Sequence, residues 1–261
     1  MITSTSNTHV RTIRSLRDDR SLRRSERLFV LEGVRLVSDV FAHDATPVLV
    51  LYDATQLART NAGQRLLDQL HALPNCSAAS AAVVQAASDT STPQGVVAVA
   101  RWPQLPVPPA PSLVVICDHI QDPGNLGTII RSCDAVGVNA ILCSPGCVDA
   151  YAPKTVRASM GSLMRVPIQT DLPWDAIAHT VTHCHVYCAN STPTSLSYTR
   201  VDWRMASALI IGNEAHGLSQ HAHALATTHV AIPMRPGIES LNAAMAASIM
   251  LFEAQRQRRP A

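Results

Sequence analysis

The sequence is poor in lysine and in aromatic side chains. Lys154 is its one lysine, so twenty of the 21 basic residues are arginine. So strong a bias reflects genome composition, and the number of arginines is therefore weak evidence for nucleic-acid binding. Aromatic residues make up 4% of a chain that is 47% hydrophobic, which predicts a core of alanine, valine, leucine and isoleucine. The formal net charge of +2 excludes a strong overall basic field.

Long apolar runs and a disulfide framework are also missing. The seven cysteines are odd in number and scattered, and Cys117, Cys143 and Cys188 lie in apolar runs typical of buried, reduced thiols. The N-terminus does not resemble a signal peptide, and the longest apolar run, residues 241–252, is too short to span a bilayer. These features predict a cytoplasmic protein with no membrane segment.

Two common nucleotide-binding motifs are absent as well. No G-x-G-x-x-G turn follows the first predicted strand of the C-terminal half, and no Gly-Lys-Ser or Gly-Lys-Thr occurs. An ordinary Rossmann-type enzyme is therefore disfavoured. His185 and Cys188 fall in a predicted strand, where their spacing directs them to opposite faces, so we expect no metal site.

Proline marks a boundary between two α/β domains. Residues 102–111 hold five of the 17 prolines, a density that fits a semi-rigid linker. Residues 1–101 predict a small α/β domain that begins with a helix over residues 8–25. Residues 112–261 alternate predicted strands (113–117, 140–143, 186–189, 208–211 and 229–232) with helices, the last over residues 239–258. This alternation predicts a mostly parallel sheet.

Positive charge is concentrated near the N-terminus. Residues 1–35 contain eight arginines and four acidic residues. That excess fits either an RNA phosphate backbone or an ordinary solvated helix face.

Three polar segments follow apolar runs in the C-terminal half. Residues 122–127 (Asp-Pro-Gly-Asn-Leu-Gly) lead into a helix for which Asn125 is a candidate N-cap, and Arg131 follows two turns later. Residues 212–217 (Gly-Asn-Glu-Ala-His-Gly) and residues 232–242 are the other two. Because the carboxyl ends of parallel strands meet at one edge of a sheet, we expect these segments to form one site.

The three segments, in this order and spacing, resemble the signature motifs of the SpoU (TrmH) family in the SPOUT superfamily. Upstream, Asn7, Val10, residues 29–35 and residues 92–96 are similar to the accessory RNA-binding domain that precedes the catalytic domain in many members. The resemblance implies an S-adenosylmethionine-dependent RNA ribose 2′-O-methyltransferase, an α/β fold with a trefoil knot in its C-terminal domain, and a homodimer.

The resemblance also implies roles for individual residues. The catalytic positions would be Asn125, Arg131, Glu214, Ser240 and Asn242. The cofactor would be held by Ala189, Asn190, Gly212, Ile232 and Leu241. Lys154 and Arg157 would neutralise an RNA phosphate. The charge excess near the N-terminus adds Arg11, Arg14 and Arg35 as candidate RNA-binding residues. We expect Arg131 to stabilise the developing alkoxide, Asn125 to orient Arg131, and Glu214 to hold the donors of the pocket.

Other functions remain open from the sequence. Ribosomal RNA is favoured as substrate, and tRNA is the alternative. A non-catalytic RNA-binding or ribosome-assembly protein that retains the fold is a second possibility. A nucleotide hydrolase that uses Glu214 is a third, but the sequence lacks a carboxylate cluster for magnesium.

Overall fold

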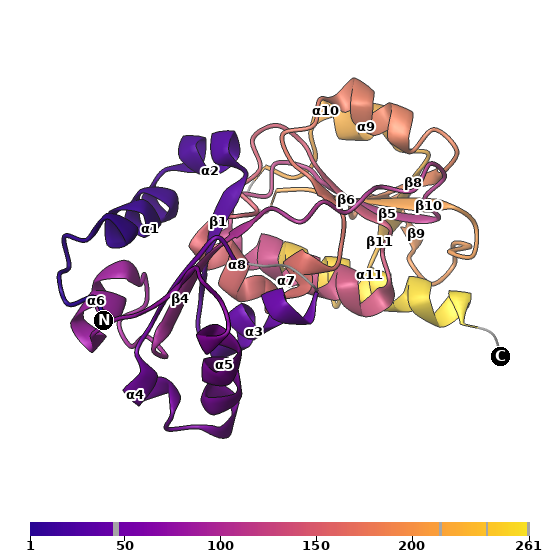
Figure 1. Cartoon of the computed structure of the whole chain (residues 1–261). Coiled ribbons are helices and arrows are strands. Elements are labelled where there is room, and N and C mark those ends of the chain that lie inside the picture. The colour runs from indigo at the N-terminus through magenta and orange to yellow at the C-terminus, as the bar shows by residue number, and fades with distance from the viewer. Residues whose placement is uncertain (44–46, 214–215, 239, 260–261) are drawn as a thin grey trace. The chain divides into compact units, whose positions relative to one another are not determined.

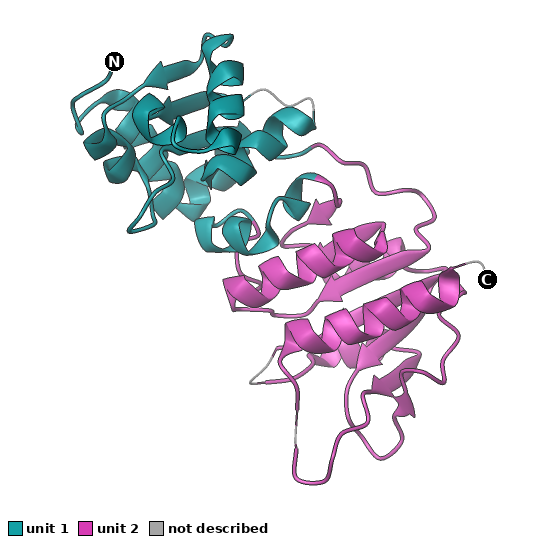
Figure 2. Ribbon diagram, turned by 90° about the horizontal axis from the view of Figure 1, so that it is seen from below, with its two compact units in different colours: residues 1–103, 151–164 teal, residues 104–150, 165–261 magenta. Residues whose placement is uncertain are grey.

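The computed structural model describes the chain except residues 44–46, 214–215, 239 and 260–261. It divides into two compact units (Figure 2). Unit 1 comprises residues 1–103 and 151–164, and unit 2 comprises residues 104–150 and 165–261. The segment 151–164, which lies beyond the proline-rich stretch in sequence, thus groups with the N-terminal part of the chain.

Unit 1 is built on a four-stranded sheet of order β1-β4-β2-β3. Strand β4 pairs antiparallel with β1 and β2, whereas β2 and β3 are parallel. The strands are β1 (Leu28–Glu32), β2 (Leu49–Tyr52), β3 (Cys76–Ala78) and β4 (Val96–Arg101). The helices are α1 (Thr8–Asp18), α2 (Arg20–Glu26), α3 (Val34–Ala42), α4 (Ala54–Leu57), α5 (Asn61–His71), α6 (Ala81–Ala87) and α8 (Pro153–Ser159), followed by a short 3₁₀ turn, η1 (Ser162–Met164).

The first predicted helix is in fact two. Asp19 is extended and ends α1, and its side chain accepts hydrogen bonds from the backbone N–H groups of Ser21 and Leu22 at the start of α2. An aspartate at an N-cap competes well with helix continuation, which explains the break. Val10, Ile13 and Leu16 of α1 are buried in the core of unit 1.

An aromatic group attaches segment 151–164 to the rest of unit 1. The ring of Tyr151 stacks on Trp102 with centroids 3.9 Å apart and lies 5.4 Å from the ring of Phe29 on β1. All three side chains are buried. Helix α8 also packs against β1.

Unit 2 contains a seven-stranded sheet of order β7-β6-β5-β10-β8-β11-β9, and every strand pair recorded among its described residues is parallel. The α/β class and the parallel sheet predicted from the sequence are confirmed. The strands are β5 (Leu113–Cys117), β6 (Ala140–Cys143), β7 (Ile168–Gln169), β8 (His185–Ala189), β9 (Leu196–Ser197), β10 (Ser207–Ile211) and β11 (Thr228–Ala231).

Helices cover both faces of this sheet (Figure 1). Helices α7 (Pro123–Val136) and α11 (Ala243–Arg258) pack against each other on one face. Helices α9 (Trp174–Thr180) and α10 (Gln220–Leu225) cover the other, where Ile177 and Ala222 join the core. Helix α11 begins later than predicted because Asn242 caps it, and Glu239 lies outside the described residues. Among the described residues, no helix combines the length and apolar character needed to cross a membrane.

Candidate functional site

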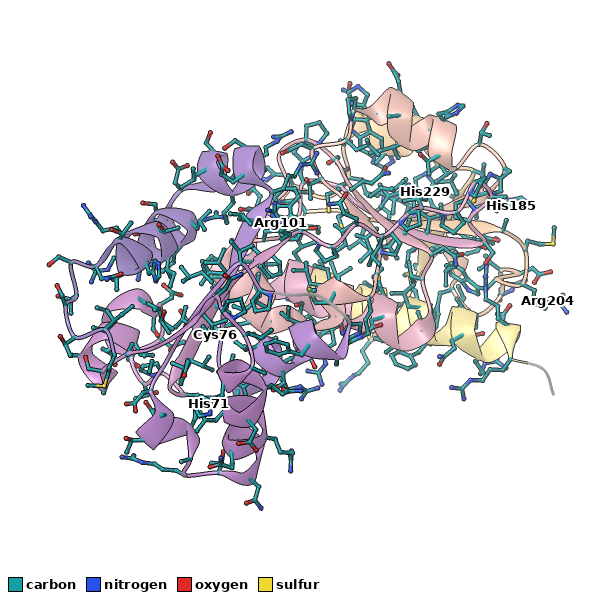
Figure 3. All side chains as sticks on the ribbon, viewed as in Figure 1. His71, Cys76, Arg101, His185, Arg204 and His229 are labelled. Carbon is teal, nitrogen blue, oxygen red and sulfur yellow. The ribbon has the colours of Figure 1, made fainter. Side chains whose placement is uncertain are left out.

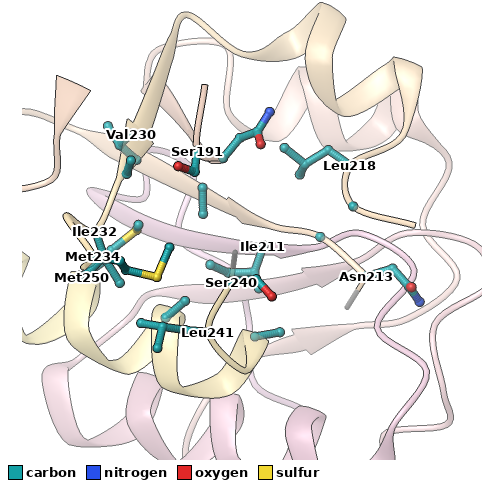
Figure 4. A pocket seen from close by; sticks show the side chains of 17 residues that line it. Ser191, Ile211, Asn213, Leu218, Val230, Ile232, Met234, Ser240, Leu241 and Met250 are labelled. Carbon is teal, nitrogen blue, oxygen red and sulfur yellow. The ribbon is translucent and has the colours of Figure 1, made fainter. Parts of the chain in front are cut away.

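The carboxyl ends of β8, β10 and β11 surround a cavity of about 250 Å³ (Figure 4). Segments that are far apart in sequence meet there, including the end of β8, the turn after β10 and the residues before α11. The lining side chains are mainly apolar, with amide and hydroxyl groups among them. The described lining residues carry no ionisable side chain. Those that the sequence singled out are Ala189, Asn190, Gly212, Ile232, Ser240 and Leu241.

All the residues predicted to hold a cofactor therefore line a single cavity, and Ser240 of the predicted catalytic group lines it too. Figure 4 shows Ile232 and Leu241 on the same side of the hollow as Met234 and Met250. The expectation that the second and third polar segments meet at one sheet edge agrees with this geometry.

Gly212 lies where two stretches of backbone come close together. A Cβ atom at this position would be 2.7 Å from the Gly217 carbonyl oxygen and 3.0 Å from Leu218 Cδ2. Gly217 is fixed in turn, because Asn213 and Gly217 exchange two backbone hydrogen bonds of 2.9 Å each. The loop after β10 is thus closed on itself, and only glycine fits at its base.

Asn213 and Asp118 support this loop, and the sequence reasoning missed both. The Asn213 amide donates to the carbonyl oxygen of His119 at 2.8 Å and accepts from the His216 N–H at 3.0 Å. Asp118 is fully buried, and its carboxylate accepts from the Ser219 N–H at 2.6 Å. Their position just after a buried strand could have identified them in the sequence, because a buried amide or carboxylate needs hydrogen-bond partners.

The first and third polar segments are joined by one hydrogen bond. The Asn242 amide nitrogen donates to the Asn125 amide oxygen at 2.9 Å. Asn242 also caps α11, since its side-chain oxygen accepts from the N–H groups of Ala244 and Met245. The expectation that Asn125 caps α7 was wrong. Asp122 is the cap, and its carboxylate accepts the Asn125 N–H at 2.8 Å.

Arg131 lies on α7 at some distance round the helix from Asn125. Six residues of an α-helix correspond to a rotation that leaves the two positions about 120° apart. Arg131 is exposed, and its guanidinium has no hydrogen-bond or ion-pair partner among the residues that the structure describes. The next residue, Ser132, bonds to Ser248 of α11 at 2.7 Å, so Arg131 sits beside the contact between α7 and α11. Glu214, the remaining predicted catalytic residue, lies outside the described residues.

The residues predicted to bind RNA all belong to unit 1. Arg11 and Arg14 lie on α1, Arg35 on α3, and Lys154 and Arg157 on α8. Some are already engaged. Arg14 Nε donates to a carbonyl oxygen of α6 at 2.7 Å, and the Arg157 guanidinium forms a 2.7 Å ion pair with Asp89.

The histidines and cysteines do not assemble into a metal site within the described part of the chain. His185, labelled in Figure 3, is exposed at the start of β8, whereas Cys188 of the same strand is fully buried. No group of three or more histidine, cysteine, aspartate or glutamate side chains among the described residues could hold a metal ion. Burial raises the pKa of Cys188 to about 12, as expected for an unreactive core thiol.

Comparison with known proteins assigns the family. The model of the SpoU rRNA Methylase family matches residues 112–252, which contain the cavity and all three polar segments. The chain belongs to the SpoU rRNA methylase family. Residues 7–98 match a second model, the MRM3-like substrate binding domain.

Several rRNA methyltransferases resemble the chain over most of its length. Mitochondrial rRNA methyltransferase 3A of Danio rerio is 32% identical, over 94% of this chain and 67% of its own. The 23S rRNA (guanosine(2553)-2′-O)-methyltransferase RlmP of Bacillus subtilis is 29% identical, over 86% of this chain and 87% of its own. The crystal structure of an AdoMet-bound rRNA methyltransferase from Sinorhizobium meliloti superimposes with a TM-score of 0.84 at 29% identity and covers 99% of this chain and 98% of the other.

Proposed function

We propose that this protein transfers a methyl group from S-adenosylmethionine to a ribose 2′-hydroxyl of RNA, with ribosomal RNA as the substrate. The observation that carries the proposal is the cavity at the carboxyl edge of the unit 2 sheet. Its described lining residues are uncharged and come in part from the second and third polar segments. The S. meliloti relative, whose structure contains AdoMet, and the B. subtilis relative, named a 2′-O-methyltransferase, support it. A cytoplasmic location is part of this proposal.

The residues around the cavity fit the cofactor. Ile211, Ile232 and Leu241 offer apolar surface to a purine ring. The Asn190 amide and the Ser240 hydroxyl offer hydrogen-bond partners to its polar atoms. The absence of a side chain at Gly212 allows the backbone to approach a ligand closely.

Bound S-adenosylmethionine supplies a methyl group already activated by its sulfonium, so the protein's task is to align and activate the ribose hydroxyl. Arg131 stabilises the developing alkoxide and binds the adjacent phosphate, because a guanidinium donates hydrogen bonds and carries a permanent charge. It does not act as a base, because a guanidinium offers only hydrogen-bond donors and no acceptor. The hydroxyl proton passes to water or to a phosphate oxygen.

The other motif residues hold the site in shape. The bond between Asn242 and Asn125 fixes the starts of α11 and α7 relative to each other, and so fixes the segment that carries Ser240. Ser240 and Asn242 then position the ribose. The role of Glu214, which holds the donors of the pocket, rests on the family resemblance alone.

We also propose that the active enzyme is a homodimer in which α7 and α11 of two copies meet. Met245 and Phe252 of α11 are 56% and 50% exposed, and Ile249 lies between them at helical spacing. An exposed apolar stripe of this kind favours a partner surface. In such a dimer the exposed Arg131 of one copy serves the cavity of the other. We propose as well that the chain of unit 2 forms the trefoil knot that the family resemblance implies.

Calorimetric titration with S-adenosylmethionine, followed by transfer of its tritiated methyl group to RNA, tests this function. We expect binding with one site per chain and transfer to ribosomal RNA. Transfer to tRNA alone would show that tRNA, and not ribosomal RNA, is the substrate. Absence of cofactor binding would contradict the proposal in favour of a non-catalytic RNA-binding protein.

A further inference from the structure

Two groups of arginines in unit 1 differ in their surroundings, and the first is held by the fold itself. Arg14 Nε donates to a carbonyl oxygen of α6 at 2.7 Å, and Arg17 Nε donates to the Asp18 carboxylate at 2.7 Å. Arg23 is 5% exposed, and its guanidinium donates to a carbonyl oxygen of α1 at 2.6 Å. Much of the positive charge near the N-terminus is therefore already engaged within the unit.

The second group consists of Arg35, Arg59 and Arg65. Arg35 lies in the first turn of α3, Arg59 follows α4, and Arg65 lies on α5. All three are exposed, and none of their guanidinium groups has a hydrogen-bond or ion-pair partner among the residues that the structure describes. Side chains of this kind keep their full hydrogen-bonding capacity for an external anion.

These arginines line one cavity of about 1010 Å³ between α3, α5 and residues 92–94. We call it the α3–α5 groove. Asp39 is the single acidic residue among its described lining residues, so positive charge is in excess there. Its lining also contains the half-buried ring of Phe41 and the buried side chain of Leu66. The groove thus combines cationic and apolar surface.

The edge of the groove formed by residues 92–94 is fixed by hydrogen bonds. Gln94 Oε1 accepts the Val34 N–H of α3 at 3.1 Å, and Gln56 Nε2 donates to the Pro93 carbonyl oxygen at 2.5 Å. Gly33 makes this packing possible, because its φ of +91° is unfavourable for other residues and a Cβ atom would lie 2.8 Å from Gln94 Oε1. A groove with fixed walls loses little conformational entropy when it binds a ligand.

We propose that the α3–α5 groove binds a single-stranded segment of the RNA substrate. This inference rests on the proposed RNA methylation and locates the contact in unit 1. Arg35, Arg59 and Arg65 neutralise successive phosphates. Phe41 and the neighbouring apolar surface receive an unstacked base. A duplex keeps its bases inside the helix and offers the groove only phosphates, and an acidic protein surface would leave the apolar part uncovered.

The test compares two triple variants of the full-length protein that remove the same charge. The groove variant is R35Q/R59Q/R65Q. The matched control is R20Q/R24Q/R101Q, whose positions are also exposed in unit 1 but lie outside the groove. Fluorescence anisotropy measures binding of a labelled, mixed-sequence single-stranded oligoribonucleotide at several potassium chloride concentrations. A duplex of the same sequence and unlabelled polyglutamate are the comparison ligands.

We expect the groove variant to lose affinity for the single strand on the order of tenfold or more. The slope of log affinity against log salt should fall by about 2, because each lost phosphate contact on a single strand contributes about 0.7. The control should keep wild-type affinity, and wild-type protein should prefer the single strand to the duplex. Equal losses in both variants, or displacement of the RNA by polyglutamate at equal charge concentration, would overturn the proposal.

The two proposals can fail separately. Calorimetry with S-adenosylmethionine reports on unit 2, and the groove variant should bind the cofactor as wild type does. If wild-type protein methylates no RNA while the groove variant alone loses RNA affinity, the proposed function fails and the groove assignment stands. If methylation occurs and both variants bind RNA equally, the groove assignment fails and the proposed function stands.

Discussion

Replacing Gly212 with alanine should weaken S-adenosylmethionine binding by displacing the loop after β10. The new Cβ atom would lie 2.7 Å from the Gly217 carbonyl oxygen, which is well inside van der Waals contact. Gly217 cannot yield freely, because it exchanges two 2.9 Å hydrogen bonds with Asn213. The loop must therefore move as a unit, and Gly212, Asn213 and Gly217 all line the cavity.

The size of the effect follows from the cost of overpacking. Extra methyl groups in packed positions cost about 1–3 kcal/mol. If the bound state bears this cost, cofactor affinity falls between about 5-fold and about 140-fold, at about 1.4 kcal/mol per factor of ten. Titration calorimetry of the full-length variant with S-adenosylmethionine measures this directly.

Gly137→Ala provides the matched control. Gly137 has a φ of +79°, and a Cβ atom added there would have no neighbouring atom within 4 Å, so alanine costs backbone strain without touching the cavity. A left-handed conformation costs a non-glycine residue about 1–2 kcal/mol. The control should therefore melt at a lower temperature and bind the cofactor normally. Unchanged affinity in Gly212→Ala, or an equal loss in the control, would refute the reasoning.

Three further predictions follow from the same contacts. Arg131→Lys should retain part of the methyl-transfer rate, and Arg131→Ala should lower kcat by about 10² to 10³. Cofactor affinity should be unchanged in both variants, because Arg131 does not line the cavity. A wild-type kcat in Arg131→Ala would contradict the proposed role of Arg131. Asn242→Asp keeps an acceptor for the α11 cap but loses the hydrogen bond donated to Asn125, whereas Asn242→Ala loses both. Chemical denaturation should therefore find Asn242→Ala less stable than Asn242→Asp by about 1 kcal/mol. Equal stability of the two variants would count against the cap. Burial raises the pKa of Cys188 to about 12 and that of Cys133 well above its usual value, so both thiols stay protonated in the folded state. Unfolded thiols ionise above about pH 8.5, so the free energy of unfolding should fall as pH rises past that value. The fall should be smaller in Cys188→Ala. Urea denaturation across this pH range checks the sign.

The sequence was sufficient for the elements whose signals are local. Apolar runs bounded by polar turns predicted the central strands of unit 2 closely, as for β5 and β6, because parallel strands are buried on both faces. Gly212, which the family resemblance singled out, lines the cavity. Strands such as β7 and β9, with two residues each, carry too little pattern to be recognised.

Contacts between distant segments were beyond local patterns. The sequence assigned the cap of α7 to Asn125, but Asp122 precedes the proline at which the helix begins and accepts the Asn125 N–H. The freed Asn125 side chain meets Asn242, which is 117 positions away in sequence. By composition, the arginine-rich N-terminus fitted an RNA-binding surface and an ordinary solvated helix face equally well. Only the folded structure distinguishes engaged arginines such as Arg14 from those that remain open.

Mapping ribose 2′-O-methylation across ribosomal RNA from cells with and without this protein tests the central claim most directly. The account predicts that a 2′-O-methyl mark disappears when the protein is removed and returns with the wild-type chain, but not with Arg131→Ala. If the purified protein binds S-adenosylmethionine but its removal from cells leaves the map unchanged, the account is contradicted.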